Sequence, residues 1–370
     1  MKGADVSRQP ESVLARVLAR LMRRALGVTA HPRETSMRRG TPVKAWTIHR
    51  YGSPDVLDLT EIDKPVPGDD EALVRVRTTS ANPYDWHNIR GEPLIGRLMG
   101  GGLGLRSPKL SILGADMAGQ VEAVGKDVTE FRPGDEVFAV LRQGGFAEYV
   151  CVPEGELAPK PKNLSFEQAA AVPMAANTAL LGLRDKGRIQ PGQKVLINGA
   201  SGGVGTFAVQ IARAFGAEVT GVCSTRNMDL VRSIGADEVI DYTTQDFTRN
   251  GQRYDLLLDI AGSRSVSACR RVLTPTGTYV VVGGPAGRWL QPVRHVFSVI
   301  AVSPFVPQRM VAADAYRCRQ NKQNLMTLTE FIEDGKITPV IDRRYPFEEI
   351  PAAVRYQEEG HAAGKVVIAL

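Results

Sequence analysis

The sequence predicts an α/β protein that combines a partly open β-barrel with a doubly wound parallel sheet. Three observations lead to this prediction. Short strand-like runs separated by Gly, Pro and Asp turns occupy residues 43–152, which is typical of small barrels. Strand and helix patterns alternate from there to residue 282, as in parallel sheets. Strand-like runs return at 337–341 and 365–370, and we expect them to complete the barrel around an inserted sheet domain.

The barrel strands are predicted from the alternation of apolar and polar residues. Within 71–79, for example, apolar residues interleave with Arg75 and Arg77, which suits a half-buried strand. The predicted barrel strands are 43–51, 56–62, 71–79, 119–124, 136–140 and 147–152. Pro159-Lys160-Pro161 then marks the end of this portion of the chain.

The sheet portion contains a strand, a glycine turn and a helix in succession. The strand, 194–197, is a short apolar run suited to a buried parallel sheet, and apolar residues recur at helical spacing over 203–215. Further predicted strands are 218–222, 238–241, 254–259 and 277–282, and further predicted helices are 166–171, 175–183, 228–234, 263–273 and 325–333. The apolar stretch 285–307 is predicted to be either a lid or subunit contact, or the ordinary packing of a long connection.

The glycine turn is the main functional signal. Glycines let a phosphate approach the backbone closely, and a helix N-terminus presents free N–H groups to it. Ala200 stands where the pattern G-x-G-x-x-G has its first glycine, so the pattern alone also fits a plain tight turn. Its place after the first strand of a doubly wound sheet favours a dinucleotide. The residues expected around the pyrophosphate are Ser201, Gly202, Gly203, Val204 and Gly205.

Length, composition and charge limit the classes of function. A chain of 370 residues is expected to form two domains. Its four cysteines are scattered without a C-x-x-C pair, which indicates no disulfide framework and no cysteine-rich zinc site and fits a reducing, cytoplasmic location. No apolar run is long enough to span a bilayer. The net charge of +6 arises within residues 1–41, which hold nine Lys or Arg and three Asp or Glu, so the main body is not expected to bind nucleic acid.

Residues 1–41 form a basic extension in which 13–24 predicts an amphipathic helix. Such a helix suits the surface of an anionic membrane or a transit segment. A loosely packed extension without a function of its own is the favoured interpretation. Met37 is a second candidate start, and a product beginning there would lack the helix and most of the excess charge.

Seven segments of the chain carry a family resemblance. They are Tyr51-Gly52-Ser53-Pro54-Asp55-Val56-Leu57, Asn82-Pro83-Tyr84-Asp85, Gly114-Ala115-Asp116-Met117-Ala118-Gly119, Phe131-Arg132-Pro133-Gly134-Asp135-Glu136-Val137, Ala200-Ser201-Gly202-Gly203-Val204-Gly205, Gly235-Ala236-Asp237-Glu238-Val239-Ile240-Asp241-Tyr242 and Gly364-Lys365-Val366-Val367. In this order they resemble the zinc-free quinone oxidoreductase branch of the medium-chain dehydrogenase/reductase superfamily. The resemblance implies a GroES-like catalytic domain at 42–160, completed by 318–370, and a Rossmann NADP-binding domain at 161–317. It also implies an active site in the cleft between them, NADPH as the hydride donor, and a homodimer formed by extending the sheet.

The chain departs from the zinc-dependent members of that superfamily. Those relatives place a cysteine where Pro83-Tyr84-Asp85 lies and a His-Glu pair where Ala115-Asp116 lies. Asp116 and His87 are two ligands without a third, so no metal site is expected, and a structural role is favoured for Asp116. Alcohol oxidation benefits from a Lewis-acid metal, whereas quinones and enones accept hydride with only hydrogen-bond donors at the oxyanion. The residues therefore favour reduction of quinones or activated double bonds.

The residues after the second sheet strand favour NADPH over NADH. NAD sites place a carboxylate about 20 residues past the glycine turn, whereas Val222-Cys223-Ser224-Thr225-Arg226-Asn227 contains none. Ser224 and Arg226 can bind a 2′-phosphate; a solvated charge at a helix start is the alternative for Arg226. Ala261 and Gly283 end later strands and are expected on the nicotinamide side.

Four further cofactor contacts are expected. The resemblance implies that Tyr242 borders the adenosine phosphate, that Thr178 lies near the nicotinamide, and that Lys365 lies near the cofactor. A surface lysine on a barrel strand is the alternative for Lys365. Asn82 is expected to orient the cofactor or its loop, because an amide does not titrate.

The substrate side is predicted on Tyr84-Asp85-Trp86-His87. Relatives usually have a tyrosine where His87 falls; either residue can donate a hydrogen bond to a carbonyl, and histidine can also transfer a proton near neutral pH. Tyr84 and His87 are the catalytic candidates, and packed aromatic side chains are the alternative for Tyr84 and Trp86. The predicted function is zinc-independent, NADPH-dependent hydride transfer to a small-molecule quinone or α,β-unsaturated carbonyl. The alternatives are a broad NADP-linked alcohol or aldehyde dehydrogenase and a non-catalytic NADPH-binding protein, which the basic N-terminal helix could direct to a membrane or partner.

Overall fold

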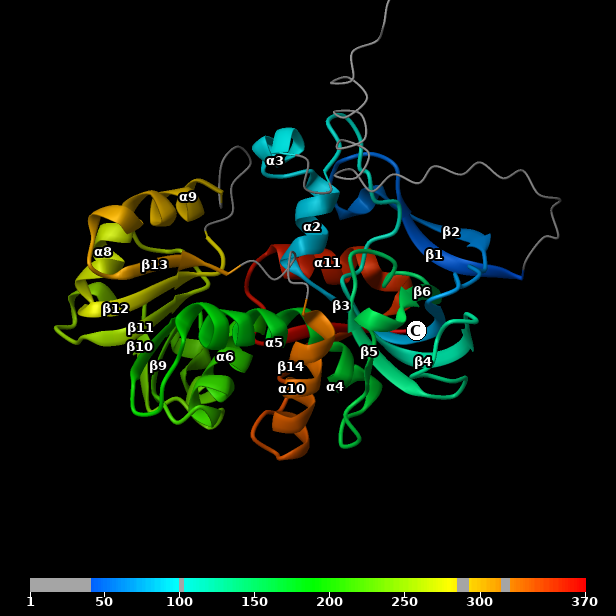
Figure 1. Ribbon diagram of the computed structural model, residues 1–370. Helices are drawn as coiled ribbons and strands as arrows, with labels where there is room; N and C mark the ends of the chain where they lie inside the picture. Colours follow the sequence, from blue (N-terminus) through cyan, green and yellow to red (C-terminus); the bar gives the residue numbers. More distant parts are fainter. Residues whose placement is uncertain (1–40, 100–102, 285–292, 314–319) are drawn as a thin grey trace, which may run out of the picture. The chain divides into compact units, whose positions relative to one another are not determined.

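The computed structural model describes residues 41–99, 103–284, 293–313 and 320–370 (Figure 1). The helix expected at 13–24 and the candidate start Met37 lie outside the described residues. Among the residues that are described, no helix is long and apolar enough to cross a membrane. The chain forms a seven-stranded sheet, a six-stranded sheet and a two-stranded ribbon with helices around them. This confirms the predicted α/β fold class.

The six-stranded sheet is parallel throughout, with the strand order β10-β9-β8-β11-β12-β13. Its strands are β8 (Lys194–Asn198), β9 (Glu218–Cys223), β10 (Glu238–Asp241), β11 (Tyr254–Asp259), β12 (Leu273–Val281) and β13 (Arg309–Ala312). The chain leaves β8 toward one edge and later returns to β11 on the other side of β8. Doubly wound sheets bind ligands at such a reversal, outside the carboxyl ends of the strands. The glycine turn follows β8 and therefore lies at this position.

The α-helices of the described residues flank this sheet and the barrel. They are α2 (Pro83–Arg90), α3 (Leu94–Met99), α4 (Phe166–Ala170), α5 (Pro173–Leu180), α6 (Gly203–Ala214), α7 (Met228–Ser233), α8 (Val266–Arg271), α9 (Val293–Val302), α10 (Asn321–Glu333) and α11 (Ile350–Glu358). α5 packs against α6 and α10 (Figure 1). The sequence prediction omits α2, α3, α9 and α11. For α2 a signal was present, because Asn82 and Asp85 form a capping box with Pro83 at the first helical position.

Both faces of the parallel sheet are buried by helices. Successive side chains of a strand point to opposite faces, so neighbouring residues of β8 belong to different core clusters. Val195 and Ile197 of β8 belong to the core cluster that includes residues of α5 and α6. Leu196, between them, belongs to the cluster that includes Cys269 of α8 and Val299 of α9. The continuous apolar run in β8 is thus explained by helices on both sides.

The seven-stranded sheet is the main sheet of the barrel portion and has the order β14-β15-β3-β4-β5-β7, with β6 paired to β3. Its strands are β3 (Glu71–Ala81), β4 (Asp116–Val124), β5 (Glu136–Val140), β6 (Tyr149–Pro153), β7 (Ala158–Pro159), β14 (Ile341–Pro346) and β15 (Lys365–Ala369). β15 runs antiparallel to β3 and places Val366 opposite Ala81. β1 (Pro42–Ile48) and β2 (Leu57–Asp63) form the antiparallel ribbon. Strands far apart in sequence therefore share one sheet, while the exact domain boundaries stay a prediction.

The strand expected at 337–341 is wrong, because the chain enters the sheet only at Ile341 as β14. The N–H of Thr338 donates to Gln210 Oε1 at 2.8 Å, and Gln210 Nε2 donates back to the Thr338 carbonyl at 3.0 Å. Pro339 has no N–H to offer a neighbouring strand. A side chain of α6 therefore takes the place of a strand partner here.

Of the apolar stretch 285–307, the structure describes residues 293–307. Val299 of α9 is buried against the sheet, so ordinary packing accounts for one side of this helix. Phe297, Ile300 and Phe305 are 55%, 48% and 85% exposed. The structure thus leaves an apolar surface beside the edge strand β13, which we call the α9 surface.

Candidate active site

The glycine turn connects β8 to α6 with the geometry of a phosphate cradle. Gly199 has φ +94°, a conformation that side chains rarely adopt. A Cβ on Gly205 would lie 2.0 Å from the Gly199 carbonyl oxygen, so only glycine allows this approach of helix to strand. Among the described residues no side chain caps the first amides of α6 at Gly202. Those N–H groups can therefore bind an anion.

Lys365 lies beside this turn although it belongs to the barrel sheet. A Cβ on Gly203 would be 3.1 Å from Lys365 Cδ. Lys365 is only 3% exposed, so the surface-lysine alternative is wrong. Its Nζ donates to Asn82 Oδ1 at 2.6 Å and to Asp116 Oδ2 at 3.1 Å. The structure thus places Lys365 next to the turn and bonds it to Asn82, another predicted cofactor contact.

A residue that sequence reasoning missed supports the turn from the next strand. Asn227 is buried, and its Nδ2 donates to Ser201 Oγ at 3.0 Å. It follows the predicted 2′-phosphate residues directly in sequence, and an asparagine after a strand end could have been identified as a loop-bonding side chain. Asn227 joins the loop after β9 to the loop after β8.

The loop after β9 carries Ser224 and Arg226 at the same edge of the sheet. Arg226 is exposed and its Nη2 donates to the carbonyl of His361 at 2.7 Å. Between these two residues, Thr225 Oγ1 donates to Asp241 Oδ2 at 2.5 Å. Hydrogen bonds from Thr225 and Thr243 lower the pKa of Asp241, so this carboxylate is charged and fixes the loop.

Tyr242 follows β10 in the same region and is 53% exposed. Its backbone N–H donates to the Cys223 carbonyl at 3.0 Å, which ties the ends of β10 and β9 together. An exposed aromatic ring at this edge is available to a bound ligand. Its contact with the adenosine phosphate stays a prediction.

Ala261 and Gly283 lie at the carboxyl ends of β11 and β12, on the other side of the reversal point. Ala261 is exposed, and a Cβ on Gly283 would lie 2.6 Å from the Ile260 carbonyl oxygen. The turn after β11, which contains Ala261, is held by Asp259, which is fully buried. Its Oδ1 accepts from the N–H of Gly262 at 2.9 Å and from Asn198 Nδ2 at 2.7 Å.

The Asp259 carboxylate also connects this turn to α9. Tyr279 OH donates to Asp259 Oδ2 at 2.5 Å, and His295 Nε2 lies 3.1 Å from the same hydroxyl. Burial raises the pKa of Tyr279 far above its ordinary value, so the phenol stays protonated as the donor. Sequence reasoning missed this buried group, because its members are distributed over β11, β12 and α9.

Thr178 is placed on α5, which is buried along its whole length. Thr178 is 8% exposed, and its Oγ1 donates to the Met174 carbonyl at 2.7 Å. The hydroxyl oxygen keeps acceptor capacity while its proton is used within the helix. Its approach to the nicotinamide stays a prediction.

Tyr84 and His87 both lie on α2, but their environments differ. Tyr84 is half-buried, and its OH donates to the Arg142 carbonyl at 3.1 Å. Burial raises the pKa of Tyr84 to about 12, so the phenol is protonated at physiological pH. Tyr84 can therefore donate a hydrogen bond to a developing oxyanion.

The environment of His87 does not favour proton exchange near neutral pH. Burial lowers the pKa of His87 to about 4, so the ring is neutral. Its Nδ1 lies 3.0 Å from the Glu92 carbonyl oxygen, which can only accept, so Nδ1 bears the proton and Nε2 is an acceptor. The ring also stacks on Trp86 at 3.6 Å between centroids. A catalytic role for His87 stays a prediction, and it no longer has the support of a pKa near neutral pH.

The carboxylate oxygens at the positions where zinc-dependent relatives have their ligands are already hydrogen-bonded. Asp85 accepts from the N–H groups of Asn82 and Gly114 at 2.8 and 3.1 Å, and Asp116 is bonded to Lys365. In the part of the chain that the structure describes, no cluster of three His, Cys, Asp or Glu residues could hold a metal ion.

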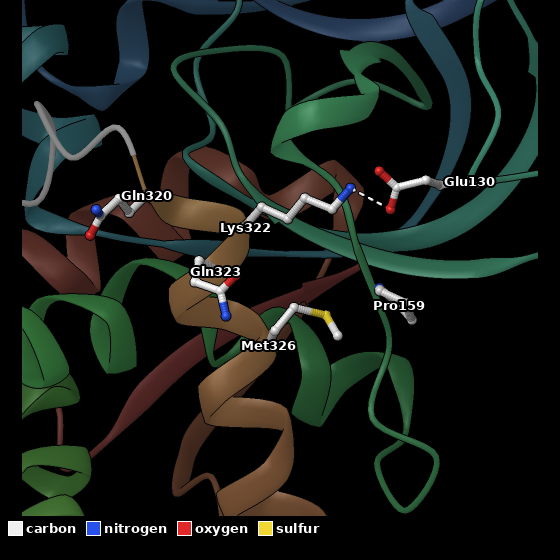
Figure 2. A pocket seen from close by; sticks show the side chains of 6 residues that line it. All are labelled: Glu130, Pro159, Gln320, Lys322, Gln323 and Met326. Atoms are coloured by element: carbon white, nitrogen blue, oxygen red, sulfur yellow. Dashed lines mark hydrogen bonds and ion pairs between the residues drawn. The ribbon is translucent and has the colours of Figure 1, made fainter.

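A separate cavity of about 480 Å³ lies at the beginning of α10 (Figure 2). Its lining residues are Glu130, Pro159, Gln320, Lys322, Gln323 and Met326. Lys322 Nζ is paired with Glu130 Oε2 at 2.8 Å and donates to the Glu154 carbonyl at 3.2 Å. None of the predicted cofactor or catalytic residues lines this cavity, so we do not assign the cofactor to it.

Comparison with known proteins identifies the family. The alcohol dehydrogenase GroES-like domain matches residues 68–162, and the family described as zinc-binding dehydrogenase matches 234–368. The mitochondrial NAD(P)H oxidoreductase RTN4IP1 of Mus musculus is 34% identical over 375 residues, covering 90% of this chain and 91% of the relative. The chloroplastic NADPH-dependent alkenal/one oxidoreductase of Arabidopsis thaliana is 33% identical over 340 residues, covering 88% and 79%. The quinone oxidoreductase structure from Coxiella burnetii aligns with a TM-score of 0.77 and 28% identity, covering 89% and 100%.

The chain therefore belongs to the medium-chain dehydrogenase/reductase family, in its quinone oxidoreductase-like branch. This confirms the resemblance identified from the seven segments, and with it the GroES-like and Rossmann-type parts of the fold. In activity it is an NAD(P)H oxidoreductase of the quinone or enone reductase kind.

Proposed function

We propose that this chain is a zinc-independent reductase that uses NADPH to reduce quinones or α,β-unsaturated carbonyl compounds. The preference for NADPH rests on one observation, which is the composition of the loop after β9. It offers Ser224 and an exposed Arg226 and contains no carboxylate through Asn227. A neutral or basic loop at this position suits a 2′-phosphate, whereas a ribose hydroxyl would call for an acidic residue.

The residues around the glycine turn fit a dinucleotide. The uncapped amides at the start of α6 and the close approach at Gly205 suit a pyrophosphate. The residues that would hold the cofactor are Asn82, Thr178, Ser201, Gly202, Gly203, Val204, Gly205, Ser224, Arg226, Tyr242, Ala261, Gly283 and Lys365. When bound, NADPH supplies the hydride for the reduction.

Tyr84 is the favoured donor to the substrate oxygen. Its raised pKa keeps the phenolic proton in place, and a positioned O–H stabilises negative charge that develops on a carbonyl or quinone oxygen. The hydroxyl would turn from the Arg142 carbonyl toward the substrate. His87, with Nδ1–H held by the Glu92 carbonyl, would offer Nε2 as an acceptor that orients the substrate.

Several relatives support this class of substrate. They include the 2-methylene-furan-3-one reductase of Solanum lycopersicum, which is 34% identical over 348 residues. The name of that enzyme and that of the alkenal/one oxidoreductase both describe electron-poor double bonds. Such acceptors need only hydrogen-bond donors at the oxygen, which this chain can provide from Tyr84.

The test is consumption of NADPH and NADH by the purified protein with naphthoquinone, an enone and a panel of simple alcohols and aldehydes. Turnover with quinone or enone and a preference for NADPH would support the proposal. Oxidation of simple alcohols by metal-free protein that fails with every quinone and enone would favour an alcohol dehydrogenase. NADPH binding without turnover across the panel would favour a non-catalytic binding protein.

We further propose that the chain forms a homodimer through β13 and the α9 surface. Among the strands of the described residues, β13 is the last of its sheet, and an unpaired strand edge can be extended by a second copy. The exposed Phe297 and Phe305 lie in the adjoining segment. Light scattering should give twice the mass of one chain, and F305D should shift the protein toward the monomer. A wild-type monomer would contradict the proposal.

A cytoplasmic location stays our proposal for where the protein acts. The names of two relatives contain the words mitochondrial and chloroplastic, which makes a transit function the alternative for residues 1–41. Fluorescent fusions of the full chain and of a version starting at Met37 would distinguish these locations. Organelle import of the longer fusion alone would contradict the cytoplasmic assignment, and liposome co-sedimentation of both versions would test membrane contact.

A further inference from the structure

Asp116, the first residue of β4, has a side chain that accepts hydrogen bonds from four directions. Its Oδ1 accepts from the N–H of Met174 at 2.7 Å. Its Oδ2 accepts from Ser80 Oγ at 2.5 Å, Asn82 Nδ2 at 2.9 Å and Lys365 Nζ at 3.1 Å. The residue is 0% exposed, so every donor that reaches this carboxylate comes from the protein.

Three of these four donors lead to predicted cofactor contacts. Asn82 and Lys365 are two such contacts, and they are also bonded to each other at 2.6 Å. Met174 lies in the first turn of α5, where a carboxylate stabilises the free N–H groups, and its carbonyl accepts from Thr178. One carboxylate thus connects β3, β15 and α5, which come from distant parts of the sequence.

The position of Lys365 makes this arrangement relevant to the glycine turn. Its side-chain stem passes beside Gly203, where a Cβ would lie 3.1 Å from Lys365 Cδ. The ammonium group has three protons, and two of them point to Asn82 and Asp116. The pairing with Asp116 therefore determines where the remaining proton and the positive charge lie relative to the turn.

Stability alone is a poor explanation for this ion pair. The side chains of Lys365 and Asp116 are 4% and 0% exposed, and burying two charges costs desolvation energy that the attraction often only balances. A pair of apolar side chains would hold the sheet together as well. The charges are better explained by a requirement for a positioned ammonium group.

We propose that Asp116 is a positioning residue that orients Lys365, and with it Asn82, for binding of the dinucleotide. This inference rests on the proposed function, because it takes both residues as cofactor contacts. Asp116 acts through its neighbours, since both of its oxygens are already occupied by protein donors. Its effect on cofactor affinity should therefore depend on whether Lys365 is present.

The test is a double-mutant cycle with D116N, K365M and D116N/K365M, read as the Kd for NADPH from nicotinamide fluorescence. In the wild-type background D116N should weaken binding about tenfold or more, and in the K365M background by less than about threefold. An equal loss in both backgrounds, or no loss in the wild type, would overturn the proposal. If D116N does not fold, the Kd for NADPH of K365M is compared with that of the double variant, in which both charges are absent. A tenfold difference between these two Kd values would overturn the proposal.

T79V is the matched structural control. Thr79 Oγ1 donates to the backbone carbonyl of Asp116 at 2.6 Å, so this variant removes a bond to the same residue and leaves its carboxylate contacts intact. T79V should lower the melting temperature and leave the Kd unchanged. Loss of cofactor affinity in T79V comparable to that in D116N would indicate a general structural role and contradict the inference.

The two proposals fail in different ways. Wild-type protein that binds NADPH but turns over no quinone or enone would reject the proposed reaction, while the binding cycle would still decide the role of Asp116. Preference for NADH would reject the proposed cofactor, and the cycle would then be read with NADH. Wild-type protein that binds neither nucleotide would overturn both.

Discussion

Replacing Arg226 with alanine should weaken NADPH binding and leave NADH binding unchanged. Arg226 is exposed in the loop after β9, and Nη2 donates to the neutral carbonyl of His361 at 2.7 Å. Asp241 holds the preceding residue, Thr225, at 2.5 Å, so the loop is already ordered. A 2′-phosphate would replace the carbonyl with a charged acceptor, whereas NADH has no such group.

The expected magnitude follows from exchanging one hydrogen bond for another. A hydrogen bond to a charged group contributes about 1.5–3 kcal/mol, and a neutral one contributes about 1 kcal/mol. Arg226 gives up the His361 bond when it binds phosphate, and solvent screening reduces the gain at an exposed site. The difference is therefore about 1 kcal/mol, which corresponds to roughly a fivefold increase in Kd for NADPH.

Fluorescence titration with both nucleotides measures this difference directly. The matched control is R232A: the Arg232 side chain is 52% exposed and pairs with Asp229 at 3.0 Å on α7, and it is not a predicted cofactor contact. R232A should bind both nucleotides as the wild type does. Unchanged NADPH affinity in R226A, or equal catalytic efficiency of the wild type with NADPH and NADH, would refute the assignment of the 2′-phosphate site.

Four further predictions concern the turn, the fold and the chemistry. Gly205→Ala should abolish dinucleotide binding and lower the melting temperature, because its Cβ would lie 2.0 Å from a carbonyl oxygen. The control is Gly155→Ala, whose Cβ meets nothing within 4 Å and which should melt like the wild type. Normal dinucleotide binding by Gly205→Ala would contradict the phosphate cradle. Burial raises the pKa of Asp85 to about 7. Between about pH 4 and 7 the folded chain therefore keeps a proton on Asp85 that the unfolded chain has lost, so the free energy of unfolding should fall as pH rises through this range. Asp85→Asn should flatten that slope, by up to about 1.4 kcal/mol per pH unit, in urea unfolding; an unchanged slope would speak against it. Tyr84→Phe should lower kcat about tenfold or more. His87→Gln should leave the shape of the pH–rate profile above about pH 5.5 unchanged, because the pKa of His87 is about 4; loss of a rate step near neutral pH would reverse this assignment.

Elements with strong local patterns could be predicted from the sequence. The strands at 136–140, 238–241 and 254–259 have the expected bounds as β5, β10 and β11, because apolar runs with turn residues at both ends are local features. The turn after β8 was likewise identified by its glycines. The strand at 337–341 failed because the deciding partner, Gln210, lies 128 residues away in sequence.

The environment of the candidate site is the part that the sequence could not predict. For Lys365 the sequence allowed two roles, a cofactor contact or a surface side chain. Its burial and its bond to Asp116, which lies 249 residues earlier in the chain, distinguish the two roles. Residue type predicted that His87 exchanges a proton near neutral pH, whereas burial lowers its pKa to about 4. Burial and long-range pairing are properties of the assembled fold, so a single sequence gives no local signal for them.

The place of β15 between β14 and β3 has a consequence for synthesis. Asn82, just after β3, and Lys365, at the start of β15, are 283 residues apart in sequence, and ribosomes add about 5–20 residues per second. β3 is therefore made roughly 15–60 seconds before the strand that covers one of its edges. During that interval an open strand edge is available for pairing with other chains. We therefore expect the nascent barrel portion to be exposed to such pairing until β15 is made, whereas all strands of the parallel sheet precede β15 in the chain.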